Sequence, residues 1–176
     1  MDCTVIITAN GSGERMKCIS PLPKFSLFYK GKRILEHLID TFPTAKVLTH
    51  YEIPYIDQSK IIKCTPTNSR RETLQRFGWL GEVLIVDCDI YLPHPFKMQK
   101  SDVDVLFWKH SDNTQTEKIP SGLYFIKDLG MTLSYWNDEI ENEIDIALDF
   151  ATHKEVYLET IHLGTPNEYT NAILGE

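Results

Sequence analysis

The hydrophobic residues of this chain fall into two kinds of segment: short continuous runs, and stretches with helical spacing. The run Cys3–Ala9 is too continuous for a half-exposed strand, so it predicts a strand covered on both faces. Val83–Val86 predicts a second such strand, and Ile34–Phe42 predicts a helix that Pro43 stops. The same reasoning predicts strands at Ala45–Thr49, Lys60–Cys64, Val103–Trp108, Gly122–Ile126 and Glu155–Leu163, and helices at Ser69–Trp79, Asn137–Thr152 and Pro166–Leu174.

Alternation of buried strands with helices predicts an α/β fold, a Rossmann-like three-layer sandwich with a mostly parallel, mixed central sheet. The length of 176 residues fits one domain spanning 1–176, and no repeat or linker divides the chain. Ligands in such folds bind at the carboxyl ends of the strands. Two polar groups are expected there, the loop Asn10–Lys17 and the sequence Asp87-Cys88-Asp89.

Composition narrows the class of partner. The net charge of −7 argues against a general nucleic-acid binder, because phosphate backbones reward clustered Lys and Arg. No apolar run is long enough to span a membrane, and no basic segment precedes the first strand. The four cysteines are scattered without a CxxC pair, which favours reduced thiols and a cytoplasmic location. The sequence carries no signal for an oligomeric state.

The loop after the first strand contains Gly-Ser-Gly. Glycines let backbone N–H groups close around phosphate oxygens, although a plain surface turn explains these glycines equally well. A Walker loop would end in Gly-Lys-Ser/Thr, and a dinucleotide fingerprint would need a third glycine where Met16 stands. An NAD-dependent enzyme is therefore not favoured. The candidate nucleotide-binding residues of the loop are Ala9, Asn10, Gly11, Ser12 and Gly13.

A longer ordered set of motifs follows this loop. Arg15 comes directly after it, then Pro23-Lys24, and then Gly-Lys-Arg-Ile-Leu-Glu-His at residues 31–37. This order resembles the opening of the nucleoside-diphosphate-sugar pyrophosphorylase and nucleotidyltransferase superfamily, which reads Ala-Gly-Gly-x-Gly-x-Arg-Met/Leu, a Pro-Lys step and Gly-Lys-Pro-x-Leu-Glu-His. The chain departs from that pattern at Asn10, Phe25 and Arg33.

The resemblance implies that Arg15 and Lys24 are the catalytic residues. Nucleotidyl transfer builds negative charge on phosphoryl oxygens, and fixed cations aimed there stabilise the transition state. The alternative is that both side chains lie in solvent on a loop.

Two acids end the second buried strand. Strand alternation would turn Asp87 and Asp89 to the same side, where carboxylate oxygens suit Mg²⁺. In the family this strand ends in a metal-binding aspartate, and Asp89 matches it best. The alternative is an exposed acidic turn.

Two later motifs extend the resemblance. Pro-Ser-Gly-Leu-Tyr-Phe at 120–125 resembles the Ser-Gly-Ile-Tyr strand of the family, which implies that Gly122 lies against the acceptor. Glu143 falls near the position of an acid that holds sugar hydroxyls, although a plain surface glutamate is the simpler interpretation. The segment from His162 to Tyr169 resembles the closing Asp-Ile-Gly-Thr-Pro-Glu-Asp-Tyr, with His162 in place of a metal-binding acid. The matches run in order from Val5 to Tyr169.

The histidine leaves several outcomes open. Imidazole is a poor ligand for Mg²⁺ and a good one for Mn²⁺, Co²⁺ or Zn²⁺. The site could prefer a softer metal, hold Mg²⁺ with one acid and waters, or lack activity. The histidine could also bond phosphate or backbone and never touch a metal.

One motif bears on the base. The pattern Arg70-x-x-Thr73-Leu74 resembles the Arg-x-x-Ser-Val stretch of the smaller cytidylyltransferases, which implies that Arg70 lies near the base and phosphates and favours CTP. The alternative is that Arg70 faces solvent on a helix.

Together these motifs imply a metal-dependent nucleotidyltransferase that uses Mg²⁺, or Mn²⁺. It would join a nucleoside triphosphate to a sugar phosphate or similar small phosphorylated acceptor and release pyrophosphate. The alternative is a catalytically inactive nucleotide-binding protein that acts as a sensor or subunit, which the short chain and His162 favour. Arg15, Lys24 and Asp89 oppose that alternative.

Overall fold

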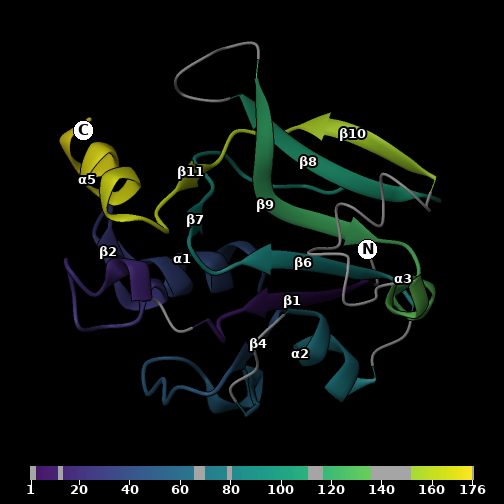
Figure 1. Ribbon diagram of the computed structural model, residues 1–176, viewed down its shortest axis with the longest axis horizontal. Coiled ribbons are helices and arrows are strands. Elements are labelled where there is room, and N and C mark those ends of the chain that lie inside the picture. The colour runs from purple at the N-terminus through teal and green to yellow at the C-terminus, as the bar shows by residue number, and fades with distance from the viewer. Residues whose placement is uncertain are drawn as a thin grey trace.

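The computed structural model describes residues 3–11, 14–65, 70–78, 81–110, 117–135 and 152–175. Its strands include β1 (Thr4–Thr8), β4 (Lys46–Thr49), β5 (Ile61–Lys63), β6 (Val83–Asp87), β8 (Asp104–His110), β9 (Lys118–Ile126) and β10 (His153–Tyr157). These form one sheet in the order β10-β8-β9-β6-β1-β4-β5, which Figure 1 shows running through the molecule.

The central sheet is mixed, with one antiparallel strand among parallel neighbours. β1 pairs in parallel with β4 and with β6, and β8 pairs in parallel with β10. Only β9 runs against its two neighbours, β6 and β8. Ile6 and Ile7 of β1 point to opposite faces and are both fully buried, as the continuous apolar run predicted. The predicted mostly parallel, mixed sheet is therefore confirmed.

Helices cover both faces of this sheet. On one face, Ile34, Leu35 and Leu38 of α1 (Ile34–Thr41) pack with β1 and β6. On the other face, Leu74 of α2 (Arg70–Phe77) and Leu129 of α3 (Leu129–Tyr135) join a second core. Two cores separated by a sheet make the three layers that the sequence predicted. Within the described residues, no helix has the length and apolar character needed to cross a bilayer.

Short elements complete the edge where β1 and β6 end. They are the 3₁₀ turns η1 (Glu14–Met16) and η2 (Lys24–Ser26), the strands β2 (Phe28–Tyr29), β3 (Lys32–Arg33), β7 (Ile90–Tyr91) and β11 (Ile161–His162), and helix α5 (Pro166–Leu174). A further turn, η3 (Gln58–Lys60), precedes β5. β7 pairs with β11 and β2 with β3, in two small sheets outside the central one.

Most predicted elements are present, with two differences. Helix α5 has the predicted bounds, because the Thr165 side chain accepts from Glu168 N at its start and Pro166 fits its first turn. The single predicted strand Glu155–Leu163 is wrong: the chain forms β10 and β11 in different sheets. Between them Thr160 Oγ1 donates to Ser121 O at 2.9 Å, which ties this connecting segment to β9. β9 also starts before its predicted first residue, since its N-terminal part pairs with β8 alone.

Some predicted elements extend beyond the described part of the chain. The helix predicted at Asn137–Thr152 lies outside the described residues except for its last residue. Both predicted ends of the helix Ser69–Trp79 also lie outside them.

A bend in β9 at Gly122 opens the end of β6. β9 pairs with β6 only as far as Leu123, and from there its N-terminal part follows β8. Figure 1 shows a sharp turn within β9. Gly122 has φ +86°, a conformation that glycine adopts without strain. Asp87 at the carboxyl end of β6 is therefore not paired with β9, although Gly122 lies beside it.

We expect Gly122→Ala to lower stability more than Gly81→Ala does. The two glycines have nearly equal φ, +86° and +84°, so the backbone cost of about 1–2 kcal/mol is shared. A Cβ at Gly122 would lie 2.6 Å from Ile90 Cγ2, whereas none of the described atoms lies within 4 Å at Gly81. Crowding should add about 1–3 kcal/mol at Gly122 alone, measured by urea unfolding. Equal losses in the two variants would contradict this account.

Candidate active site

The ends of β1 and β6 place two acids and a glycine-containing loop at one edge. Figure 1 shows both strands ending on the side of the molecule that carries β7 and β11. β6 ends at Asp87, and Cys88 and Asp89 form a turn before β7. Because the strand stops at Asp87, alternation no longer decides where Asp89 points. The contacts of each acid decide it instead.

Asp89 is held by an ion pair with Lys24. The Lys24 ammonium donates to Asp89 Oδ2, and the two side chains are only 20% and 18% exposed. Lys24 begins η2, which is anchored by the buried ring of Phe25. A charged pair with this little exposure interacts more strongly than a surface salt bridge. The predicted catalytic lysine and the predicted metal ligand are thus in direct contact.

The segment after β11 holds Asp89 from another side. Leu163 N donates to Asp89 O at 2.8 Å. A Cβ on Gly164 would collide with Asp89 Oδ2 and would lie 3.0 Å from Asp89 Cγ. Glycine is therefore required here to let the backbone approach the carboxylate. Gly164 belongs to the closing motif, but sequence reasoning did not assign it this role.

Lys24 stays charged at neutral pH. Burial lowers the pKa of its ammonium, but the charges of Asp89 and Asp87, with the hydrogen bond to Asp89, outweigh that cost. The net pKa therefore lies above the ordinary value for lysine. The site keeps a fixed cation beside Asp89.

Asp87 has a different set of neighbours. Thr8 Oγ1 of β1 lies 3.5 Å from Asp87 Oδ1, and a Cβ on Gly122 would lie 3.5 Å from Asp87 Oδ2. A glycine thus stands against each acid, Gly122 beside Asp87 and Gly164 beside Asp89. The backbone of Gly122 therefore lies beside Asp87, and its contact with an acceptor stays a prediction.

The donor set is compatible with a hard cation. Asp87 and Asp89 offer carboxylate oxygens, and Mg²⁺ is held by one or two carboxylates together with waters and substrate phosphates. Among the described residues, no group of three or more His, Cys, Asp and Glu side chains could hold a metal ion. These residues therefore fit an ion completed by substrate oxygens better than a closed protein cage.

His162 lies on β11, paired with Ile90 of β7. Its Nδ1 is 3.9 Å from Glu168 Oε1, and its Nε2 is buried without a hydrogen-bond partner in the described part of the chain. Burial, followed by the nearby charge of Lys109, lowers the pKa of the imidazole. Lys109 is itself buried and donates to Thr160 O at 3.3 Å. A neutral imidazole is therefore expected at pH 7.

The glycine loop is tied to the neighbouring strands by side chains. Asn10 Nδ2 donates to Thr65 O at 3.4 Å, and Asn10 Oδ1 lies 2.6 Å from His50 Nδ1. The Tyr51 hydroxyl donates to Gly11 O at 3.2 Å. His50 and Tyr51 were not singled out from the sequence. Their position directly after the predicted strand Ala45–Thr49 was the available signal, because ligands bind at the carboxyl ends of strands.

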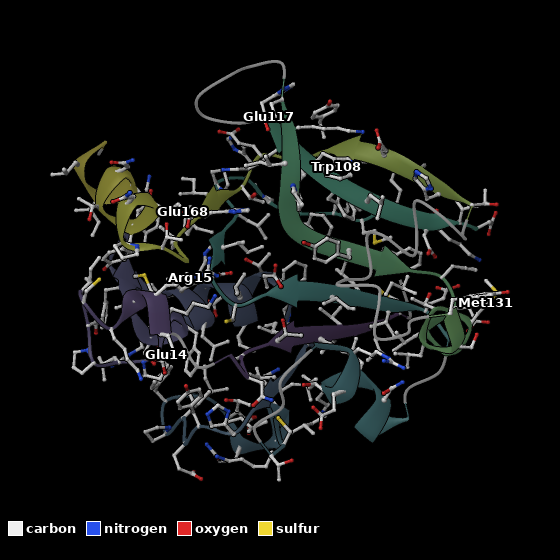
Figure 2. All side chains as sticks on the ribbon, viewed as in Figure 1. Glu14, Arg15, Trp108, Glu117, Met131 and Glu168 are labelled. Atoms are coloured by element: carbon white, nitrogen blue, oxygen red, sulfur yellow. The ribbon has the colours of Figure 1, made fainter. Side chains whose placement is uncertain are left out.

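The other predicted site residues are spread more widely. Arg15 is exposed on η1, where the fully buried Met16 anchors the turn, and Figure 2 shows it on the side of the molecule that carries Glu168. Arg70 begins α2. Ala9 is buried at the end of β1, and its N–H donates to Leu48 O at 2.8 Å. Ser12, Gly13 and Glu143 lie outside the described residues.

A separate cavity of about 600 Å³ opens between β2, β11 and α5. None of the predicted site residues lines it. Its lining consists of Tyr29, Lys30, Ile161, Asn171, Ala172 and Gly175.

His162 should make stability depend on pH. Its pKa is lowered in the folded state, so below its ordinary value of 6.5 the unfolded chain takes up the proton first. Folding stability should then fall as the pH drops from 7.5 to 5.5, and less steeply in His162→Gln. His37, whose pKa burial also lowers, is present in both proteins and cancels in the comparison. Urea unfolding at the two pH values measures the difference, and equal slopes would contradict a neutral buried His162.

The comparisons with known proteins bear on the fold. No protein-family model matches the sequence, and no curated protein matches it. Solved structures do match. The CTP:phosphocholine cytidylyltransferase of Streptococcus pneumoniae superimposes with a TM-score of 0.78 over 100% of both chains, at 13% identity.

Two further structures agree with this match. The nucleoside-diphosphate-sugar pyrophosphorylase of Vibrio cholerae RC9 gives a TM-score of 0.68 at 15% identity, over 97% of this chain and 100% of that one. The inositol-1-phosphate CTP transferase of T. maritima gives 0.67 at 10% identity, over 94% and 90%. The chain therefore has the fold of the nucleotidyltransferases, and it has that fold over nearly its whole length.

Proposed function

We propose that the chain is a nucleotidyltransferase that joins a nucleoside triphosphate to a small phosphorylated acceptor and releases pyrophosphate. The observation that carries the proposal is the Lys24–Asp89 pair at the end of β6, next to the loop after β1. It places a fixed cation and a carboxylate where α/β folds bind ligands. Sugar phosphates are the acceptors that the sequence resemblance favours.

In the proposed reaction, a phosphate oxygen of the acceptor attacks the α-phosphorus of the triphosphate. The bond from the α-phosphorus to the oxygen that bridges it to the β-phosphate breaks, and pyrophosphate leaves. The Lys24 ammonium stabilises the charge that develops on the α-phosphate, and the exposed Arg15 guanidinium binds the departing pyrophosphate. Binding both substrates in line removes much of the cost of bringing them together.

Asp89 and Asp87 would hold Mg²⁺ in this proposal, with Mn²⁺ as an alternative. When bound, the ion would neutralise phosphate charge and orient the triphosphate. His162 brings a neutral imidazole near Asp89, and we place it outside the ligand set because its Nε2 is buried. His162→Asp should accordingly preserve activity with Mg²⁺.

The names of the structural neighbours support the class of substrate. Two of them use CTP according to those names, one with phosphocholine and one with inositol 1-phosphate. The Arg70-x-x-Thr73-Leu74 pattern favours the same nucleotide. We therefore propose CTP as the preferred triphosphate, with Ala9–Gly13 and Arg70 around it, and Gly122 and Glu143 at the acceptor.

The test is pyrophosphate release from the purified chain. The four nucleoside triphosphates are crossed with common phosphorylated acceptors, each with Mg²⁺ and with Mn²⁺. Release with at least one pair supports the enzyme. Tight triphosphate binding without release would support the inactive nucleotide-binding alternative.

We expect Lys24→Ala to lower kcat by about 10²–10³-fold, because it removes a preorganised charge contact. It should also lower stability by about 1–3 kcal/mol, since Asp89 is left partly buried without its partner. Arg15→Ala should lower activity similarly without this stability loss, because Arg15 is exposed. Lys32→Ala is the matched control, since its pair with Asp40 is exposed. Activity near wild type in both Lys24→Ala and Arg15→Ala would contradict the assignment.

The two acids should differ in their contribution. Asp89→Asn removes the charge nearest Lys24 and should abolish Mg²⁺-dependent release. Asp87→Asn should weaken it less, because Asp87 lies against Thr8 and Gly122 instead. Titration of activity against Mg²⁺ concentration measures both effects. The opposite order would make Asp87 the principal metal ligand.

A further inference from the structure

The ends of β1, β4 and β5 are joined by one side chain. Asn10 follows β1, His50 follows β4, and Thr65 lies just beyond β5. Asn10 contacts both of the others, at 2.6 Å from His50 Nδ1 and 3.4 Å from Thr65 O. This network lies at the strand ends where the loop after β1 begins.

The network requires a proton on Nδ1 of His50. Thr65 O is a carbonyl and can only accept, so the Asn10 atom that faces it must be the amide nitrogen. Asn10 therefore presents its oxygen to His50, and an amide oxygen can only accept. The proton of His50 must then lie on Nδ1, which leaves Nε2 of the neutral ring as an acceptor.

The second ring nitrogen of His50 is available to a ligand. Among the described residues, none hydrogen-bonds to Nε2. This atom is accessible at the surface. The ring is half-buried and lies on Tyr51, with centroids 3.9 Å apart. Tyr51 in turn contacts Phe25 at 5.4 Å and donates to Gly11 O. The orientation of the ring is thus set by contacts on both sides.

The sheet order places His50 on the opposite side of β1 from the two acids. Asp87 and Asp89 follow β6, on one side of β1, and His50 follows β4, on the other. A triphosphate on the loop, with its α-phosphorus beside Lys24 and Asp89, would direct its nucleoside toward β4 and β5. The nearby cation Lys63 is paired with Glu52 at 2.7 Å, so this side suits an uncharged base better than a phosphate.

We propose that His50 selects the nucleobase by accepting a hydrogen bond from an exocyclic amino group. This inference rests on the proposed function. Cytosine carries an amino donor at position 4, where uracil, like thymine, carries a carbonyl acceptor. Two acceptors facing each other cannot form a hydrogen bond, and the buried edge would be left unsatisfied. Asn10 acts as the positioning residue, because it fixes the tautomer of His50.

The experiment compares CTP and UTP, which differ in the group at position 4 and at N3, an acceptor in cytosine and a donor in uracil. Isothermal titration of wild type, without acceptor, should give a Kd for CTP lower by roughly tenfold. A triphosphate of 2-pyrimidinone, which has neither group at position 4, should bind between the two. His50→Phe keeps a ring on Tyr51 but has no acceptor, and it should bring the CTP and UTP affinities within about threefold of each other.

His110→Phe is the control, because His110 also stacks on a tyrosine, Tyr157. This pair lies near the opposite edge of the central sheet, on β8 and β10. It should keep the wild-type preference. Equal affinities of wild type for CTP and UTP, or a preference unchanged in His50→Phe, would overturn the role of His50 while leaving the proposed function intact. Failure of wild type to bind any nucleoside triphosphate would overturn the proposed function and this inference with it.

Discussion

The contact between Lys24 and Asp89 is the interaction around which this edge of the molecule is built. Asp89 stands in a turn beyond the end of β6, and Lys24 stands on a 3₁₀ turn that the buried Phe25 anchors. Removing either charge from water is costly, and each offsets that cost for the other. The close approach of Gly164 and the bend of β9 at Gly122 both leave room for the carboxylates at this point. Such an arrangement favours the binding of a charged ligand over the binding of a purely apolar one.

The same edge separates two kinds of environment. Around β6 the side chains are charged, and the backbone comes close through glycines. Around β4 and β5 they are aromatic or amide-bearing, with the nearby lysine neutralised by Glu52. A nucleoside triphosphate has the same division, with a charged end and an uncharged aromatic end. The charged end of the proposed substrate would therefore match the charged side chains near β6, and its base would match the uncharged ones near β4 and β5.

Much of the fold could be predicted from the sequence, because its signals are local. The run Cys3–Ala9 predicts a doubly covered strand, and the pair Thr165-Pro166 is typical of a helix start. The split between β10 and β11 could not be predicted this way. It depends on Thr160 reaching Ser121, a contact between segments far apart in the chain. For the same reason the sequence indicated Lys24 and Asp89 separately but could not show that they touch, and His50 carried no motif at all.

The pairing of β11 with β7 can form only after the part of the chain beyond β10 has been synthesised. Asp89 lies midway along the sequence and contacts Lys24, which is made before it, but Leu163 and Gly164 are made well after it. A ribosome-bound chain that had emerged only as far as β9 would contain most strands of the central sheet, yet its Asp89 would lack these two neighbours. The contacts of Leu163 and Gly164 with Asp89 therefore form late in synthesis. A nascent chain that lacks β11 cannot yet hold Asp89 from both Lys24 and Leu163, as the finished chain does.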